Sequence, residues 1–278
     1  MADDPTGDDT SDLDLPGRHG LTPGWGRERL MATAPGQVAE VGFEHAPALF
    51  RSDRLPEEVR EAFADLWDAT AAEVVDFVNV HGVERLRTRA GRRALWRRLE
   101  VLLARAQRLA IGLGHAYPLD MGRWGHRTVG VVGSSGVAAG EQVIAGASVF
   151  TGPTSALIIT FVGAAMTELL EVYVATSARV ERYRFAARSP SVQTIAADMG
   201  AVYGASGLGS RPADRRVIEE AMRVMLTRVI RRAQWRFGDA LVPVVGPVIA
   251  GAMTGSAVTR TQSPALREPD ELERGRSD

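Results

Sequence analysis

Apolar residues recur at three- and four-residue steps along much of this chain, which is the spacing of a helix with one buried face. The first such stretch runs from Leu55 to Gly82, where Pro56 suits a helix start and Gly82 a helix end. Its expected buried stripe is Phe63, Leu66, Trp67, Ala71, Val74, Val75 and Val78. The pattern predicts an amphipathic helix, and its repetition elsewhere predicts an all-α fold.

Two further amphipathic stretches, about 83–113 and 215–237, are predicted to be helices with arginine-rich polar faces. Three interpretations of these faces remain open: a solvated surface, a surface that contacts anionic lipid headgroups, and a nucleic-acid patch. Trp96 is the only aromatic residue of the first helix, so a stacking platform for bases is missing and nucleic acid is disfavoured as a partner.

An apolar block from Thr128 to Ala178 separates the two basic stretches, and its centre carries the turn signal Thr151-Gly152-Pro153-Thr154. The turn divides the block into two arms, 128–150 and 155–178, each long enough as a helix to cover about 30 Å. One interpretation is a membrane-inserted hairpin. The other is a buried helix pair in a soluble core, which three glutamates within the block favour because acids are costly inside a bilayer.

Glycines spaced as GxxxG predict close helix packing at two places, Gly136 with Gly140 and Gly251 with Gly255. The second pair lies in an uncharged segment, 240–259, which follows the second basic helix. The expected fold class is therefore an all-α helical bundle with two glycine-rich apolar segments and disordered termini.

The remaining segments complete the predicted organisation. Residues 180–187 are expected to extend the second arm as a charged helix, Ser191 to cap a short helix through about Tyr203, and 204–214 to form a linker. The domain boundaries predicted are a disordered acidic tail at 1–20, an irregular extension at 21–50, one all-α domain at 51–261 and a disordered charged tail at 262–278. The acidic tail either solubilises the protein or screens its arginine-rich body.

Composition narrows the functional classes. The formal net charge is -1, and all 33 basic residues are arginine. The chain has no cysteine, which excludes disulfides and cysteine-ligated metal sites. The opening residues MADDPTGDDTSDLDLPG lack the basic and apolar regions of a signal peptide, so the expected compartment is the cytoplasm.

Motifs that carry chemistry are missing from the sequence: it contains no GxSxG, no HExxH and no GxGxxG after a strand. We therefore predict no catalytic residue and no cofactor. Glu141, Glu168 and Glu171, with His126, are a remote candidate for a metal site, although the Glu-x-x-His pairs of helical metal sites do not occur. The alternatives for these glutamates are pairing with arginine or polar hydrogen bonding.

The closing segment FGDALVPVVGPVIAGAMTGSAVTRT, from Phe237 to Thr261 behind a basic helix, resembles the end of bacterial EcsC-family proteins. The segment from Thr151 to Tyr173 is compatible with the glycine-rich middle of that family. The resemblance covers about 130 residues, from Thr128 to Arg260, and rests on patterning. It implies a helical protein related to membrane transport or secretion, and it supplies no catalytic residues.

These observations together predict a non-catalytic, membrane-associated accessory protein at the inner face of the bacterial cell membrane. Its partners would be anionic lipid or membrane proteins. The residues predicted to contact anionic headgroups are Arg92, Arg93, Arg97, Arg231, Arg232 and Arg236. The alternative is a soluble helical scaffold that mediates protein–protein or homo-oligomeric contacts, and the remote alternative is a metal-dependent enzyme.

Overall fold

The computed structural model describes residues 23–119, 153–187, 189–202 and 215–240. Eight α-helices and no strand occur within these ranges, which confirms the all-α prediction for the described part of the chain. Several predictions fall outside it: the first arm, both GxxxG pairs, nearly all of the apolar segment 240–259, the linker 204–214, and the tails 1–20 and 262–278.

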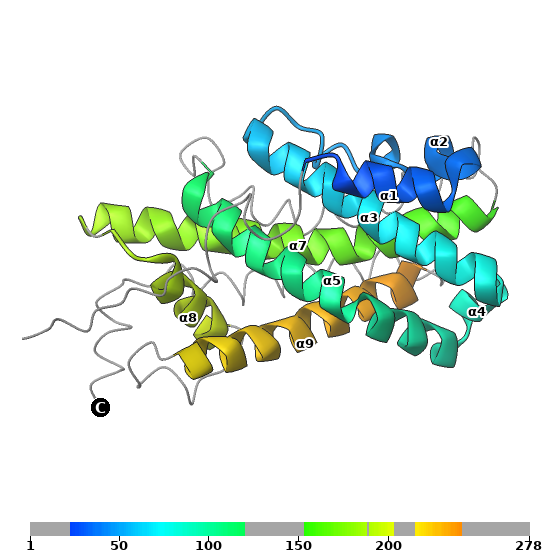
Figure 1. The fold of residues 1–278 in the computed structure, drawn as a ribbon. Helices are drawn as coiled ribbons and strands as arrows, with labels where there is room; N and C mark the ends of the chain where they lie inside the picture. Colours follow the sequence, from blue (N-terminus) through cyan, green and yellow to red (C-terminus); the bar gives the residue numbers. More distant parts are fainter. Residues whose placement is uncertain (1–22, 120–152, 188, 203–214, 241–278) are drawn as a thin grey trace, which may run out of the picture.

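Helix α7, Pro153–Phe185, is the centre of the bundle (Figure 1). It contacts α3 (Glu57–His81), α5 (Arg89–Ala116) and α9 (Arg215–Ala240). Phe161 of α7 stacks on Trp96 of α5 at 4.3 Å between ring centroids and meets Phe237 of α9 edge-on at 5.0 Å. These rings join three helices in one core, because aromatic pairs bury large apolar areas.

The second arm of the predicted hairpin is thus a core helix of this fold. Among the described residues α7 is the one helix long and apolar enough to cross a membrane, but 83% of its most apolar window is buried inside the protein. The predicted continuation through residues 180–187 is confirmed as far as Phe185. Val180 and Tyr183 of this stretch are buried in the core.

Residues 24–50, expected to be irregular, contain helix α1 (Trp25–Thr33), the short helix α2 (Val38–Val41) and the 3-10 turns η2 (Pro35–Gln37) and η3 (Phe43–His45). Helix α1 lies along α3. At the crossing, a Cβ atom on Gly26 would stand 1.8 Å from the carbonyl oxygen of Asp65. Glycine therefore permits a backbone approach that periodicity alone does not reveal.

The single helix predicted for residues 83–113 is wrong. The chain forms α4 (Glu84–Arg87), breaks at Thr88, and begins again as α5. Thr88 has an extended backbone, and its hydroxyl accepts a hydrogen bond from the Gly91 N–H at 3.0 Å. Threonine competes with helix continuation in this way because its side chain satisfies a free N–H of a new helix.

Helix α8, Val192–Val202, begins as predicted, since the Ser191 hydroxyl accepts a hydrogen bond from the Thr194 N–H at 3.1 Å. The helix packs on α9, where a Cβ on Gly200 would lie 2.2 Å from the Cβ of Ala221. Close packing through single glycines, expected at the GxxxG pairs, is thus observed at other positions of the described fold.

Candidate anion-binding surface

The arginines predicted to contact headgroups differ in their surroundings. Arg92 donates hydrogen bonds to the carbonyl oxygens of Leu86 and Arg87, at 3.2 and 2.7 Å, and so closes the end of α4. Arg232 points toward α7, where its guanidinium lies 3.2 Å from Glu171 and 3.7 Å from Glu168. Both side chains hold the fold together. Arg236 belongs to α9, but its side chain lies outside the described part of the structure.

The glutamates considered as metal ligands are buried, Glu168 with 1% and Glu171 with 6% of its surface exposed. Pairing with Arg232 compensates their burial, as one of the sequence interpretations proposed. Within the described ranges, no group of three or more histidine, aspartate or glutamate side chains is placed to hold a metal ion. Glu141 and His126 lie outside those ranges.

Arg93 and Arg97 are exposed on α5 and belong to a longer row. Exposed residues recur there at four-residue steps, which makes successive members neighbours in a row that winds around the exposed side of the helix. The row consists of Arg89, Arg93, Arg97, Val101 and Arg105, with Arg108 one turn further on. Val101 is 65% exposed, so an apolar side chain lies in the middle of a basic row.

Helix α9 presents a second basic row. Arg231 is exposed, with Arg228 and Trp235 exposed on the same side of the helix. The indole of Trp235 is 61% exposed, although the neighbouring Phe237 is fully buried. A large exposed aromatic ring beside arginines is the combination found where a protein contacts the headgroup region of a membrane.

The helices that carry the two rows are neighbours in the bundle. Helices α5 and α9 both pack on α7 and also contact each other, and the Gln107 amide nitrogen donates to the Met222 carbonyl oxygen at 3.0 Å. We refer to the exposed residues of the two rows together as the α5–α9 basic face. Its members are Arg89, Arg93, Arg97, Val101, Arg105, Arg108, Arg228, Arg231 and Trp235.

The charge of the α5–α9 basic face is poorly compensated. Glu100 is the only acidic residue of α5, and the sequence of α9 carries none from Ala221 to Gly238. Within the described ranges, no arginine of the face forms an ion pair with another residue, whereas Arg98 at the edge pairs with Glu73 at 2.7 Å. The exposed guanidinium groups therefore produce a positive potential over this face.

Other polar clusters are buried and hold helices together. Arg179 on α7 and Asp198 on α8 are 0% and 1% exposed, and they form an ion pair at 3.0 Å. The Tyr183 hydroxyl donates to the same carboxylate at 2.6 Å. Burial raises the pKa of Tyr173, whose hydroxyl donates to the Tyr117 carbonyl oxygen. These buried groups join segments of the protein to one another.

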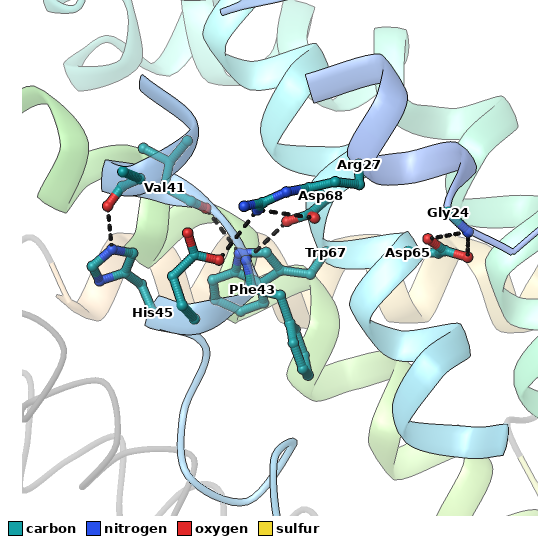
Figure 2. Close-up of polar contacts among 10 residues, drawn as sticks. Gly24, Arg27, Val41, Phe43, His45, Asp65, Trp67 and Asp68 are labelled. Atoms are coloured by element: carbon teal, nitrogen blue, oxygen red, sulfur yellow. Dashed lines mark hydrogen bonds and ion pairs between the residues drawn. The ribbon is translucent and has the colours of Figure 1, made fainter. Parts of the chain in front are cut away.

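Figure 2 shows the polar contacts that fasten α1 and η3 to α3. Asp68 accepts a hydrogen bond from the Phe43 N–H at 2.8 Å and lies 3.4 Å from Arg27. Asp65 accepts two hydrogen bonds from the Gly24 N–H, at 3.0 and 2.9 Å. Burial raises the pKa of both carboxyl groups, and the N–H donors only partly offset this effect. This cluster fixes the point from which residues 1–22 must depart.

The comparisons of this chain with protein families, curated proteins and solved structures give no match. The EcsC resemblance accordingly stays an expectation. The predicted site includes Arg93, Arg97 and Arg231. It does not include the other members of the face, which are Arg89, Val101, Arg105, Arg108, Arg228 and Trp235. The four-residue spacing from Arg97 through Val101 to Arg105 is readable in the sequence, whereas the exposure of Trp235 depends on how α9 rotates against α7.

Proposed function

We propose that this protein is a peripheral membrane protein that binds anionic lipid surfaces reversibly through the α5–α9 basic face. The observation that carries the proposal is the exposure of Val101 and Trp235 on two neighbouring helices, beside arginines that form no ion pair with other described residues. Arginines attract anionic headgroups, and the apolar side chains enter the interfacial layer. The proposal agrees with what the EcsC resemblance implies and invokes no catalytic step.

Peripheral binding fits better than insertion of the hairpin's second arm. Helix α7 contributes Phe161, Leu169 and Tyr173 to a protein core in which they are fully or almost fully buried. Insertion of α7 into lipid would require this core to open, and the buried Glu168 would lose its pairing with Arg232. A preformed exposed face needs no such rearrangement.

The expected free energy of membrane binding is sufficient for reversible attachment. Each arginine near an anionic leaflet contributes on the order of 1 kcal/mol, so several arginines acting together give binding that salt can release. At about 1 M salt the Debye length falls to roughly 3 Å, which screens most of this attraction. At this salt concentration, the apolar contacts of Val101 and Trp235 alone are too small to keep the protein on the membrane.

The test is cosedimentation of the full chain with vesicles of phosphatidylcholine, with and without phosphatidylglycerol. The wild-type protein should sediment with the anionic vesicles alone. A face variant, Arg97→Gln, Arg105→Gln and Arg231→Gln, should bind at least about tenfold more weakly, which is the loss expected when several surface arginines are removed.

A charge-matched control replaces exposed arginines elsewhere, Arg54→Gln, Arg87→Gln and Arg184→Gln, and should retain most of the binding. A second pair separates apolar contact from charge: Trp235→Ser should weaken binding, and Val80→Ser, which alters an exposed valine on α3, should not. Equal binding to neutral and anionic vesicles would refute the proposal. A soluble, monodisperse wild-type protein that binds neither vesicle type would favour the scaffold alternative.

A further inference from the structure

Residues 1–22 have the charge opposite to that of the α5–α9 basic face. They include a single arginine, Arg18, and a series of aspartates, namely Asp3, Asp4, Asp8, Asp9, Asp12 and Asp14. We propose that this segment occupies the basic face of its own molecule and competes there with anionic lipid. The inference rests on the proposed function, because it adds an intramolecular competitor for the surface that is proposed to bind lipid.

The attachment point lets the acidic segment reach the face. The Gly24 N–H is held by Asp65 on α3, so residues 1–22 depart from the first turn of α1. Helix α1 packs on α3 and α3 packs on α5, which puts the α5 axis about two helix spacings, or roughly 20 Å, from α1. Twenty-two residues span at most about 75 Å, several times that distance.

The route must pass around the bundle, since Figure 1 shows α1 and α9 on opposite sides of it. The excess length allows that detour. The arginines of the face form no ion pair with the other described residues. Docking of the acidic residues would therefore compensate a positive charge that the folded helices leave uncompensated. Such ion pairs are individually weak, and tethering within one chain makes their combination effective.

The chain also supplies a second acidic segment that serves as a control. Residues 267–276 contain Glu268, Asp270, Glu271 and Glu273, but arginines at 267, 274 and 276 interrupt them. Their local charge is nearly balanced, so they fit a basic face less well than residues 1–22 do. Neutralising these acids changes the overall charge of the protein without removing the proposed competitor.

The first test measures binding to phosphatidylcholine vesicles that contain phosphatidylglycerol. Replacing all six aspartates of residues 3–14 by asparagine should tighten binding by about threefold, the change expected if the face is occupied about two-thirds of the time. The four-acid control, Glu268→Gln, Asp270→Asn, Glu271→Gln and Glu273→Gln, should change it much less. Equal effects of the two variants would overturn the inference, because both would then reflect overall charge.

A second readout needs no lipid. Because the chain has no cysteine, spin labels can be attached selectively at Thr10→Cys and at Thr227→Cys on the exposed side of α9. The distance distribution between them should contain a short population at low salt that disappears at about 1 M salt and in the six-aspartate variant. A distribution that neither change alters would refute docking of the segment.

The two readouts separate the inference from the proposed function. A short, salt-sensitive label distance together with no binding to anionic vesicles would confirm docking and refute lipid binding. Vesicle binding that depends on the arginines of the face, with no change in label distance, would confirm lipid binding and refute the competitor.

Discussion

Two glycines of α5 are predicted to respond in opposite directions to the same substitution. A Cβ added to Gly114 would lie 2.7 Å from Cβ and 2.8 Å from Cγ2 of Thr176 on α7, and 2.9 Å from the Tyr173 carbonyl oxygen. A Cβ added to Gly112 would meet nothing within 4 Å. Gly114→Ala should therefore destabilise the protein, whereas Gly112→Ala should stabilise it by restricting the unfolded chain.

The magnitudes follow from these contacts. Overpacking at Gly114 should cost about 1–3 kcal/mol, since one partner is backbone of α7 and cannot rotate away. Gly112→Ala should add about 0.4–1 kcal/mol. Roughly 2–4 °C of midpoint shift accompanies each kcal/mol in a protein of about this size, so Gly114→Ala should lower the unfolding temperature by about 2–12 °C. Gly112→Ala should raise it by about 1–4 °C.

The assay is thermal and urea unfolding of both variants, followed by far-ultraviolet circular dichroism, with the wild-type protein as the reference. The reasoning depends on α5 crossing α7 at Gly114 and on open space beside Gly112. A higher unfolding temperature for both variants would contradict that crossing, because intrinsic helix propensity alone would then explain the data. A lower unfolding temperature for both would contradict the open space beside Gly112.

Three further substitutions probe the other local arguments. Trp67→Phe should lower the free energy of unfolding by about 1–3 kcal/mol, because the buried carbonyl oxygen that accepts from the indole N–H at 2.9 Å loses its donor. Urea unfolding measures this loss. Thr88→Ala should cost about 0.5–2 kcal/mol through the lost cap of α5, read from the same curves. Asp68 has a pKa raised by burial, so its contribution to stability is present below pH 3.8 and lost as pH rises through the raised pKa. The unfolding free energy of wild type minus that of Asp68→Asn should accordingly fall from acid toward neutral pH, and a rise would contradict this sign.

Helix positions could be predicted from the sequence where apolar spacing and capping signals agree. Helix α3 occupies Glu57–His81, close to the expected 55–82, and α8 starts behind Ser191 as expected. The break at Thr88 was not predicted, although the sequence carries a sign of it: Leu86 and Leu95, both buried, are nine residues apart, which is two and a half turns and would put them on opposite sides of one continuous helix. At the break, the Thr88 hydroxyl accepts a hydrogen bond from the Gly91 N–H and so caps the new helix α5.

The candidate surface was harder to derive, because it depends on which arginines turn inward. Arg231 and Arg232 are adjacent in the sequence, yet Arg231 is exposed and Arg232 pairs with Glu171 across the α7–α9 contact. Helix rotation of about 100° per residue separates them, but the sequence does not fix the absolute rotation. The partner of Arg232 lies 61 residues away, a relation that local patterning cannot supply.

The most direct test of peripheral binding is fractionation of cells that express the full chain, followed by washing of the membranes with about 1 M salt and then with alkaline carbonate. The account predicts that wild-type protein sediments with membranes and is released by the salt wash, as expected for attachment through exposed arginines. It also predicts that the variant with Arg97→Gln, Arg105→Gln and Arg231→Gln is recovered in the initial soluble fraction. Wild-type protein that stays in the membrane through both washes, or that never sediments with it, would contradict the account.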